Sequence, residues 1–173
     1  MSKLVTTFLY IHFKLLLLAL SLSHISSELH NDDPEQAILL KVKTYWQNPP
    51  SINHWAPSVN SSSRYHCSWP EITCVNNSVT GLSLRNKSIN KPIPSFLCDL
   101  QNLKVIELNY NNIAGEFPKS VYNCSKLEYL DLSQNYFVGK IPDDIDSLGQ
   151  LQYLNLMANN FSGNIPVAIG RLQ

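Results

Sequence analysis

The chain has 173 residues, and its 13 Lys and Arg residues balance 13 Asp and Glu residues, so the formal net charge is zero. Without a basic surplus or a basic stripe, nucleic acid is not an expected partner. The sequence also has no Gly-rich phosphate loop after a strand, no serine nucleophile elbow and no kinase Lys and Asp set. We therefore expect no enzyme activity, no metal centre and no cofactor in this chain.

Residues 1–27 have the features of a secretory signal peptide. Lys3 and Lys14 precede a leucine-rich run, small residues follow, and cleavage after Ser23 or after Ser27 fits equally well. A membrane anchor would need a longer apolar run than Lys14 permits. The mature chain is therefore expected to be exported.

Residues 32–46 are predicted to form a helix. Asp33 can cap it, Pro34 suits its first position, and the prolines after Asn48 end it. Its apolar face has helical spacing and consists of Ile38, Val42, Tyr45 and Trp46. Packing, rather than ligand binding, explains this face.

A polar loop is expected over residues 51–65, and two closely spaced cysteines follow it. In an exported chain, Cys67 and Cys74 most simply form a disulfide. The alternative is a metal site that adds His54 and His66, but these four residues lack a metal-ligand spacing.

A tandem repeat of 24 residues fills the rest of the chain. The segment 103–115 returns at 127–139 and at 151–163, and an eroded copy occupies 79–91. A unit of this length cannot bury its own apolar edge, so successive units must stack as a solenoid.

Each unit begins with a short strand. In the segment 105–109, alternation directs Ile106 and Leu108 inward and the other side chains outward. One strand per coil requires a parallel sheet. An Asn recurs where the chain leaves the strand, at Asn111, Asn135 and Asn159, and its buried amide can pair with backbone groups of neighbouring coils. A Gly for a bend follows in the last three units, where the first unit has Lys91, and a Pro that ends the pairing follows in all four.

Two further cysteines, Cys98 and Cys124, lie at different places within their repeats. Cys124 falls in a column otherwise held by Leu100, Leu148 and Leu172. We therefore expect Cys124 to be a buried thiol that acts as a small hydrophobic residue. A bridge between Cys98 and Cys124 is the alternative.

Five sequons make an exported chain a candidate glycoprotein. Their acceptors are Asn60, Asn76, Asn86, Asn123 and Asn160. The polar loop makes Asn60 the favoured site. Asp143, Asp144 and Asp146 form a separate cluster after a proline, where capping of a helical turn is expected in preference to calcium binding.

The outward strand positions are free of any core requirement, so an extended ligand could lie across them. Tyrosines at these positions offer the amphipathic area that interfaces favour. The candidate ligand-binding residues are Glu107, Asn109, Tyr110, Tyr129, Asp131, Ser133, Tyr153 and Asn155. The hypothesis is that this face binds a peptide or a protein.

The repeat pattern L-x-x-L-x-x-L-x-L-x-x-N-x-[LF]-x-G-x-[IF]-P resembles the plant-type leucine-rich repeat. The resemblance implies an α/β solenoid, a right-handed coil with a parallel β-sheet on its concave face. Residues 28–78, with the helix, Trp55, Trp69 and the disulfide, resemble the capping domain that precedes such repeats. Residues 79–173 would then hold about four repeats, the last one truncated.

The sequence pattern of residues 99–145 resembles the start of the ectodomain in plant leucine-rich repeat receptor-like kinases, particularly the HAESA-like group. That resemblance implies a secreted peptide ligand, a possible co-receptor, a single membrane-spanning helix and a cytoplasmic Ser/Thr kinase, the last two outside this chain. Because Gln173 stops inside a repeat, we expect a fragment located on the extracellular side of the plasma membrane. The alternative is a short secreted protein of the apoplast, co-receptor-like or polygalacturonase-inhibitor-like.

Overall fold

The structure is a computed structural model that describes residue 14 and residues 33–57 and 65–172. The predicted signal peptide, apart from Lys14, and the sequon at Asn60 lie outside the described residues. The chain from Pro34 onward forms one compact unit. Within the described residues, no helix is long and apolar enough to cross a membrane.

The N-terminal part of this unit packs a helix and two short helical turns against the first strands. The helix α2 (Pro34–Tyr45) begins at a proline, as predicted, because the first position needs no backbone N–H donor. These elements are α2, η1 (Pro50–Ile52), η2 (Tyr65–Ser68) and β1 (Ile72–Val75). Leu39, which the predicted face omitted, is fully buried, whereas Tyr45 is 42% exposed. Trp55 and Trp69 stack with ring centroids 5.1 Å apart.

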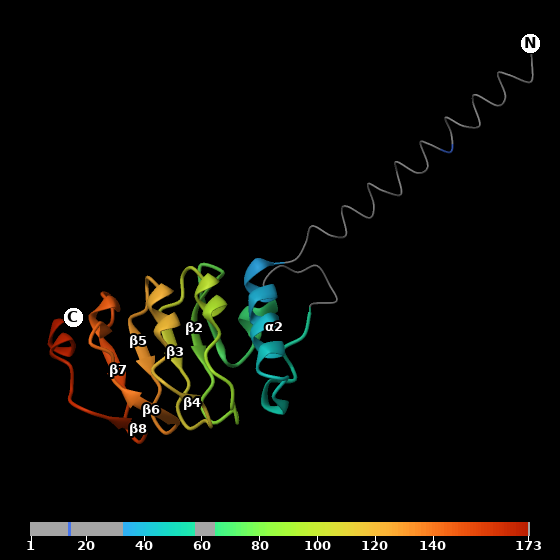
Figure 1. The fold of residues 1–173 in the computed structure, drawn as a ribbon. Helices are drawn as coiled ribbons and strands as arrows, with labels where there is room; N and C mark the ends of the chain where they lie inside the picture. The colour runs from blue at the N-terminus through green and yellow to red at the C-terminus, as the bar shows by residue number, and fades with distance from the viewer. Residues whose placement is uncertain (1–13, 15–32, 58–64, 173) are drawn as a thin grey trace, which may run out of the picture. The chain divides into compact units, whose positions relative to one another are not determined.

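One strand from each coil joins a parallel sheet, and Figure 1 shows these strands side by side along the stack. The strands are β2 (Ser78–Ser83), β3 (Val105–Glu107), β5 (Tyr129–Asp131) and β7 (Tyr153–Asn155). Their register pairs Leu82 with Ile106, Ile106 with Leu130, and Leu130 with Leu154. The predicted 24-residue columns are confirmed. Among the strands of the described residues, β1 alone pairs antiparallel, with β2, and this hairpin was not predicted.

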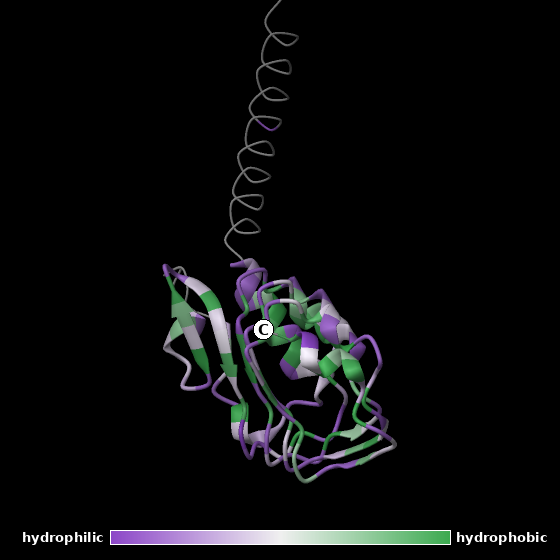
Figure 2. Cartoon of the chain, turned by 90° about the vertical axis from the view of Figure 1, so that its left-hand side faces the viewer, coloured by the Kyte–Doolittle hydropathy of each residue, from purple (hydrophilic) through white to green (hydrophobic). Residues whose placement is uncertain are grey.

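The return segments carry a second set of short elements. A small parallel sheet contains β4 (Ala114–Gly115), β6 (Tyr136–Lys140) and β8 (Asn160–Ser162). Helical turns follow the repeated prolines: η3 (Ser95–Asp99), η4 (Lys119–Asn123), η5 (Ile145–Ser147) and η6 (Val167–Arg171). Figure 2 looks along the stack from its C-terminal end and shows the successive coils one behind another.

The asparagine column forms a ladder inside the solenoid, as predicted. Asn135 Nδ2 donates to the Leu108 carbonyl of the preceding coil at 2.9 Å, and its Oδ1 accepts from the Ile113 N–H at 3.0 Å. Asn111 and Asn159 make the corresponding bonds to the coils before them. These amides satisfy backbone groups that the turn after each strand removes from the sheet.

The residue before each ladder position has a left-handed backbone, which the sequence did not indicate. The φ angles are 54° at Asn86, 57° at Tyr110, 54° at Gln134 and 53° at Ala158. None of these residues is glycine, so the conformation is imposed by the bonds of the turn rather than by backbone freedom. The side chains of this column consequently leave the strand at its end, and all four residues are exposed.

The expectation of a free thiol at Cys124 is wrong. Cys98 and Cys124 form a disulfide with a Cα–Cα distance of 4.7 Å. Because η3 and η4 lie in successive coils and stack on each other, Cys98 in η3 meets Cys124, which directly follows η4, although the two occupy different columns. The sequence columns compare positions that are 24 residues apart. They miss this pair because its two cysteines are 26 residues apart.

The acidic cluster does not cap a helical turn through its side chains. Asp144 stands at the N-cap of η5 but makes no side-chain cap bond. Its carboxylate instead accepts from Lys119 Nζ at 2.7 Å and from the Tyr122 hydroxyl at 3.2 Å. Asp146 accepts from Arg171 Nε at 2.6 Å. The carboxylates of Asp144 and Asp146 thus pair with residues of adjacent coils.

Candidate ligand-binding surface

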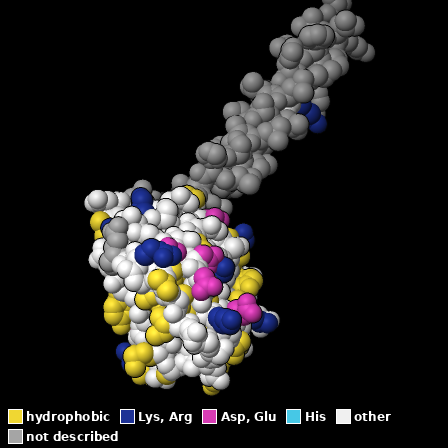
Figure 3. Space-filling model, turned by 60° about the vertical axis from the view of Figure 1, so that its left-hand side comes forward, with side chains coloured by type: hydrophobic (Ala, Val, Ile, Leu, Met, Phe, Trp, Pro, Cys, Tyr) yellow, Lys and Arg dark blue, Asp and Glu magenta, His cyan; other side chains and the backbone are white. Residues whose placement is uncertain are grey.

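The outward side chains of β2, β3, β5 and β7, with the residues just after each strand, form one surface, here called the concave surface. Several large side chains are exposed on it: Tyr110 at 48%, Tyr153 at 42% and Met157 at 75%. In the view that brings the C-terminal end forward, Figure 3 shows exposed hydrophobic side chains among basic and acidic groups. Such a mixture can contact a partner through apolar area and fix its orientation through charge.

Aromatic rings are ordered along this surface by the register of the strands. Tyr129 and Tyr153 are paired neighbours, and their rings stack with centroids 4.2 Å apart and planes at 4°. Burial and the neighbouring Tyr153 hydroxyl raise the pKa of Tyr129 to about 12. The guanidinium of Arg85 lies 4.8 Å from the ring centroid of Tyr110. Both contacts hold the rings in fixed positions.

Two of the predicted ligand-binding residues are occupied by internal bonds. Asp131 and Ser133 are only 6% exposed. The Ser133 hydroxyl and its backbone N–H donate to one Asp131 oxygen at 2.6 and 2.9 Å. Asn155 Nδ2 donates to the other at 3.3 Å. These bonds support the sheet, so Asp131 and Ser133 have little area left for a ligand.

The remaining predicted residues differ in exposure. Tyr110 and Tyr153 are exposed, whereas the half-buried ones are Glu107, Asn109, Tyr129 and Asn155. Glu107 accepts a bond from the Ser83 hydroxyl. Alternation alone places all of them on the same face, but it does not tell which side chains neighbouring coils will cover.

A buried carboxylate joins residues 33–57 and 65–75, here called the capping segment, to the first repeat, and the sequence did not reveal it. Glu71 is 4% exposed. It accepts from His54 Nε2 at 2.8 Å, Trp55 Nε1 at 3.0 Å and Lys87 Nζ at 2.6 Å. Lys87 occupies the ladder position of the first repeat, where later repeats have Asn. Its departure from the column was the one available sign of this contact.

We predict that Glu71 makes stability depend on acid pH. Burial alone would raise the pKa of Glu71, but the three donors and the Lys87 charge outweigh burial and lower the pKa to about 2. An unfolded Glu has a pKa near 4.3. The Glu71 carboxylate therefore makes its full contribution to the free energy of unfolding above about pH 4.3, and this contribution disappears as the pH falls to about 2.

Urea unfolding of the chain and of Glu71→Gln, measured between neutral and acid pH, checks this. The free energy of unfolding of the variant should be about 2 kcal/mol lower at neutral pH, and it should depend less on pH than that of the native chain. Glu128→Gln, which alters the 38%-exposed carboxylate of an outer ion pair, is the control with little effect. Parallel acid profiles for the native chain and Glu71→Gln would contradict the assignment.

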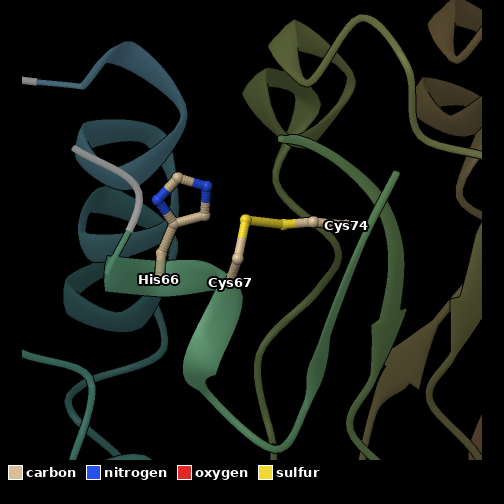
Figure 4. A group of neighbouring side chains, drawn as sticks. All are labelled: His66, Cys67 and Cys74. Atoms are coloured by element: carbon tan, nitrogen blue, oxygen red, sulfur yellow. A yellow bond between two sulfur atoms is a disulfide. The ribbon is translucent and has the colours of Figure 1, made fainter. Parts of the chain in front are cut away.

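The alternative metal site near the capping helix does not have the required ligands. Figure 4 shows His66 between α2 and the bond that joins Cys67 to Cys74. The two sulfur atoms form a disulfide and offer no thiolates. His66 Nε2 lies 3.6 Å from Glu35 Oε2, and both Glu35 oxygens already accept bonds from Ser78 and Val79.

Four of the five sequon acceptors lie within the described residues, and all four are exposed: Asn76, Asn86, Asn123 and Asn160. Asn86 stands on the concave surface, and Asn123 is in η4. Accessibility permits glycosylation at each, which stays a prediction.

Comparison with known families decides what this solenoid is. The Leucine rich repeat model matches residues 77–135 and 101–161, and the Leucine rich repeat N-terminal domain model matches residues 32–75. The chain is a leucine-rich repeat protein. This leucine-rich repeat chain carries both the capping segment and the repeats, in the order that the two models describe.

Its relatives include plant receptor proteins. The leucine-rich repeat receptor protein kinase EMS1 of Arabidopsis thaliana is 36% identical over 96 residues, which is 56% of this chain and 8% of EMS1. The Arabidopsis HAESA ectodomain, solved with the peptide hormone IDA and the co-receptor SERK1, is 29% identical with a TM-score of 0.72. That match covers 82% of this chain and 24% of the HAESA chain.

A shorter ectodomain also matches. The Arabidopsis BIR2 ectodomain is 29% identical with a TM-score of 0.71, and the match covers 80% of this chain and 76% of that one. The match spans less than a third of the length of EMS1 and of a second curated relative. These similarities confirm the resemblance to plant leucine-rich repeat receptor kinases, and the matched solved structures are ectodomains of such receptors.

Proposed function

We propose that this chain is an extracellular ligand-recognition module and that its concave surface binds a peptide or a protein. The observation that supports this most is the exposure of three large side chains, Tyr110, Tyr153 and Met157, on one surface. Large exposed side chains that are held by their neighbours offer contact area at small entropic cost.

The likeness to receptor ectodomains supports a place at the start of a receptor-like kinase. HAESA binds a peptide hormone together with a co-receptor. By analogy, this module would perceive a secreted peptide outside the plasma membrane, and a longer parent chain would supply the membrane span and the kinase. The two disulfides fit an oxidising extracellular compartment.

A short secreted repeat protein is the second candidate, because an ectodomain of similar extent, that of BIR2, has the same fold. An antibody against residues 51–64, applied to membrane and apoplastic fractions with and without glycosidase, separates the two. A large membrane-bound product supports the receptor. A small soluble glycoprotein supports the secreted form.

Ligand binding is tested with the immobilised chain and the extracellular peptide fraction of the source tissue. Tyr110→Ser combined with Tyr153→Ser should reduce the retained peptide at least tenfold, since each ring is a central contact. The matched control is Tyr136→Ser, which removes a ring that is 59% exposed but belongs to β6. Equal retention by the native chain and the double variant would refute binding at the concave surface.

A further inference from the structure

A pocket of about 170 Å³ lies at the end of the concave surface nearest the capping segment. It is here called the Gly81 pocket, and its lining includes Thr73, Gly81, Lys104, Val105, Glu107 and Glu128. The register of the sheet explains the hollow. Gly81 pairs with Val105, which pairs with Tyr129, and Tyr129 with Tyr153. From the C-terminal coil toward the capping segment, this column therefore holds two stacked tyrosine rings, then the aliphatic side chain of Val105, and finally Gly81, which has no side chain.

The hairpin formed by β1 and β2 leaves little room for a side chain at position 81. A Cβ atom on Gly81 would lie 3.0 Å from Cβ of Thr73, which is closer than ordinary packing allows. Thr73 belongs to the antiparallel strand β1, and no other repeat within the described residues has such a neighbour. The pocket is therefore a feature of the first coil alone, with β1 as an additional wall.

The pocket combines an apolar floor with carboxylates. Glu128 is paired with Lys104 Nζ at 2.6 Å. Glu107 accepts the Ser83 hydroxyl on Oε2, and its Oε1 has no hydrogen bond to the described residues. Two carboxylates and one ammonium leave one negative charge, carried by Glu107 beside the aliphatic Val105. An anionic group would be repelled there, and a neutral apolar group would leave the carboxylate unpaired.

We propose that the Gly81 pocket binds a basic side chain, Lys or Arg, of the ligand. The aliphatic stem would lie along Gly81 and Val105, and the cation would reach Glu107 Oε1, where a charge-assisted hydrogen bond can form. This inference rests on the proposed binding of a peptide at the concave surface. It adds a position at which that surface selects the charge of its ligand.

The test titrates the isotope-labelled chain with Nα-acetyl-lysine N-methylamide and with its norleucine analogue, which lacks the ammonium group. The lysine probe should shift the backbone amide signals of Gly81 and Val105 in a saturable way, and the norleucine probe should not. Glu107→Gln should weaken the lysine probe about tenfold, in line with one charge-assisted bond. Glu116→Gln, an exposed carboxylate outside the pocket, should leave binding unchanged.

Val105→Phe provides a second variant that keeps all charges. Its ring would extend the stack of Tyr129 and fill the hollow, so the lysine probe should no longer bind. Equal shifts with both probes, or lysine binding that survives both Glu107→Gln and Val105→Phe, would overturn the proposal.

The peptide-retention experiment separates this inference from the proposed function. Loss of retention in the double tyrosine variant, with no effect of Glu107→Gln on the lysine probe, would refute the pocket and leave the concave surface supported. Saturable lysine binding at Gly81, with full retention by the double tyrosine variant, would support the pocket and refute the wider surface.

Discussion

Replacing Asn135 with alanine is expected to lower the free energy of unfolding by about 3 kcal/mol, because buried backbone groups of two coils lose their partners. The Asn135 amide donates to the carbonyls of Leu108, Leu132 and Ser133. Its oxygen accepts from the buried N–H of Ile113. Alanine has no side-chain donor or acceptor, so these buried groups would be left without partners. Urea unfolding followed by circular dichroism measures the loss.

Asn112→Ala is the matched control for this ladder substitution. Asn112 lies one position after the ladder in the preceding repeat, is exposed, and contributes only its backbone N–H, to the carbonyl of Ile89. Its replacement should change the free energy of unfolding by less than about 0.5 kcal/mol. Equal losses for Asn112→Ala and Asn135→Ala would show that the ladder amide has no special weight.

The disulfide between Cys98 and Cys124 is expected to contribute about 3 kcal/mol, and that between Cys67 and Cys74 about 2 kcal/mol, because the first closes a longer loop. The sequence separations are 26 and 7 residues. The paired alanine variants Cys98→Ala with Cys124→Ala, and Cys67→Ala with Cys74→Ala, are compared by urea unfolding without reductant.

The tryptophans locate the effect of each disulfide variant. Trp46, Trp55 and Trp69 all lie in the capping segment, so their fluorescence follows that segment while circular dichroism follows the whole sheet. Loss of the Cys67–Cys74 bond should shift the fluorescence transition most. A Cys98 and Cys124 variant as stable as the native chain would contradict the prediction that this bond clamps two coils.

The columns of the repeat were predictable because each recurs in an equivalent environment. Ile106 and Leu108 are fully buried, and Asn135 pairs with the preceding coil, as alternation and periodicity indicated. Contacts made only once were not predictable in this way. Glu71 meets Lys87 because the capping segment folds back, and Cys98 meets Cys124 because two helical turns stack.

In the candidate site, too, features that recur in every repeat were predictable, and contacts made only once were not. Period-two alternation placed Tyr153 and Asp131 on one face, but only the structure shows that the first is exposed and the second bound to Ser133. The Gly81 pocket escaped prediction because it depends on Thr73 of an antiparallel hairpin outside the repeat pattern.

The asparagine ladder has a direction, and this affects the order in which the chain can fold. Asn111, Asn135 and Asn159 each bond to the coil before them. A coil is therefore complete only when the next one has been made, while Lys87 bonds the first coil to the capping segment. During synthesis the N-terminal part emerges first. We therefore expect each newly made coil to close its predecessor, so that the solenoid grows from its cap with a single unfinished coil at its advancing end.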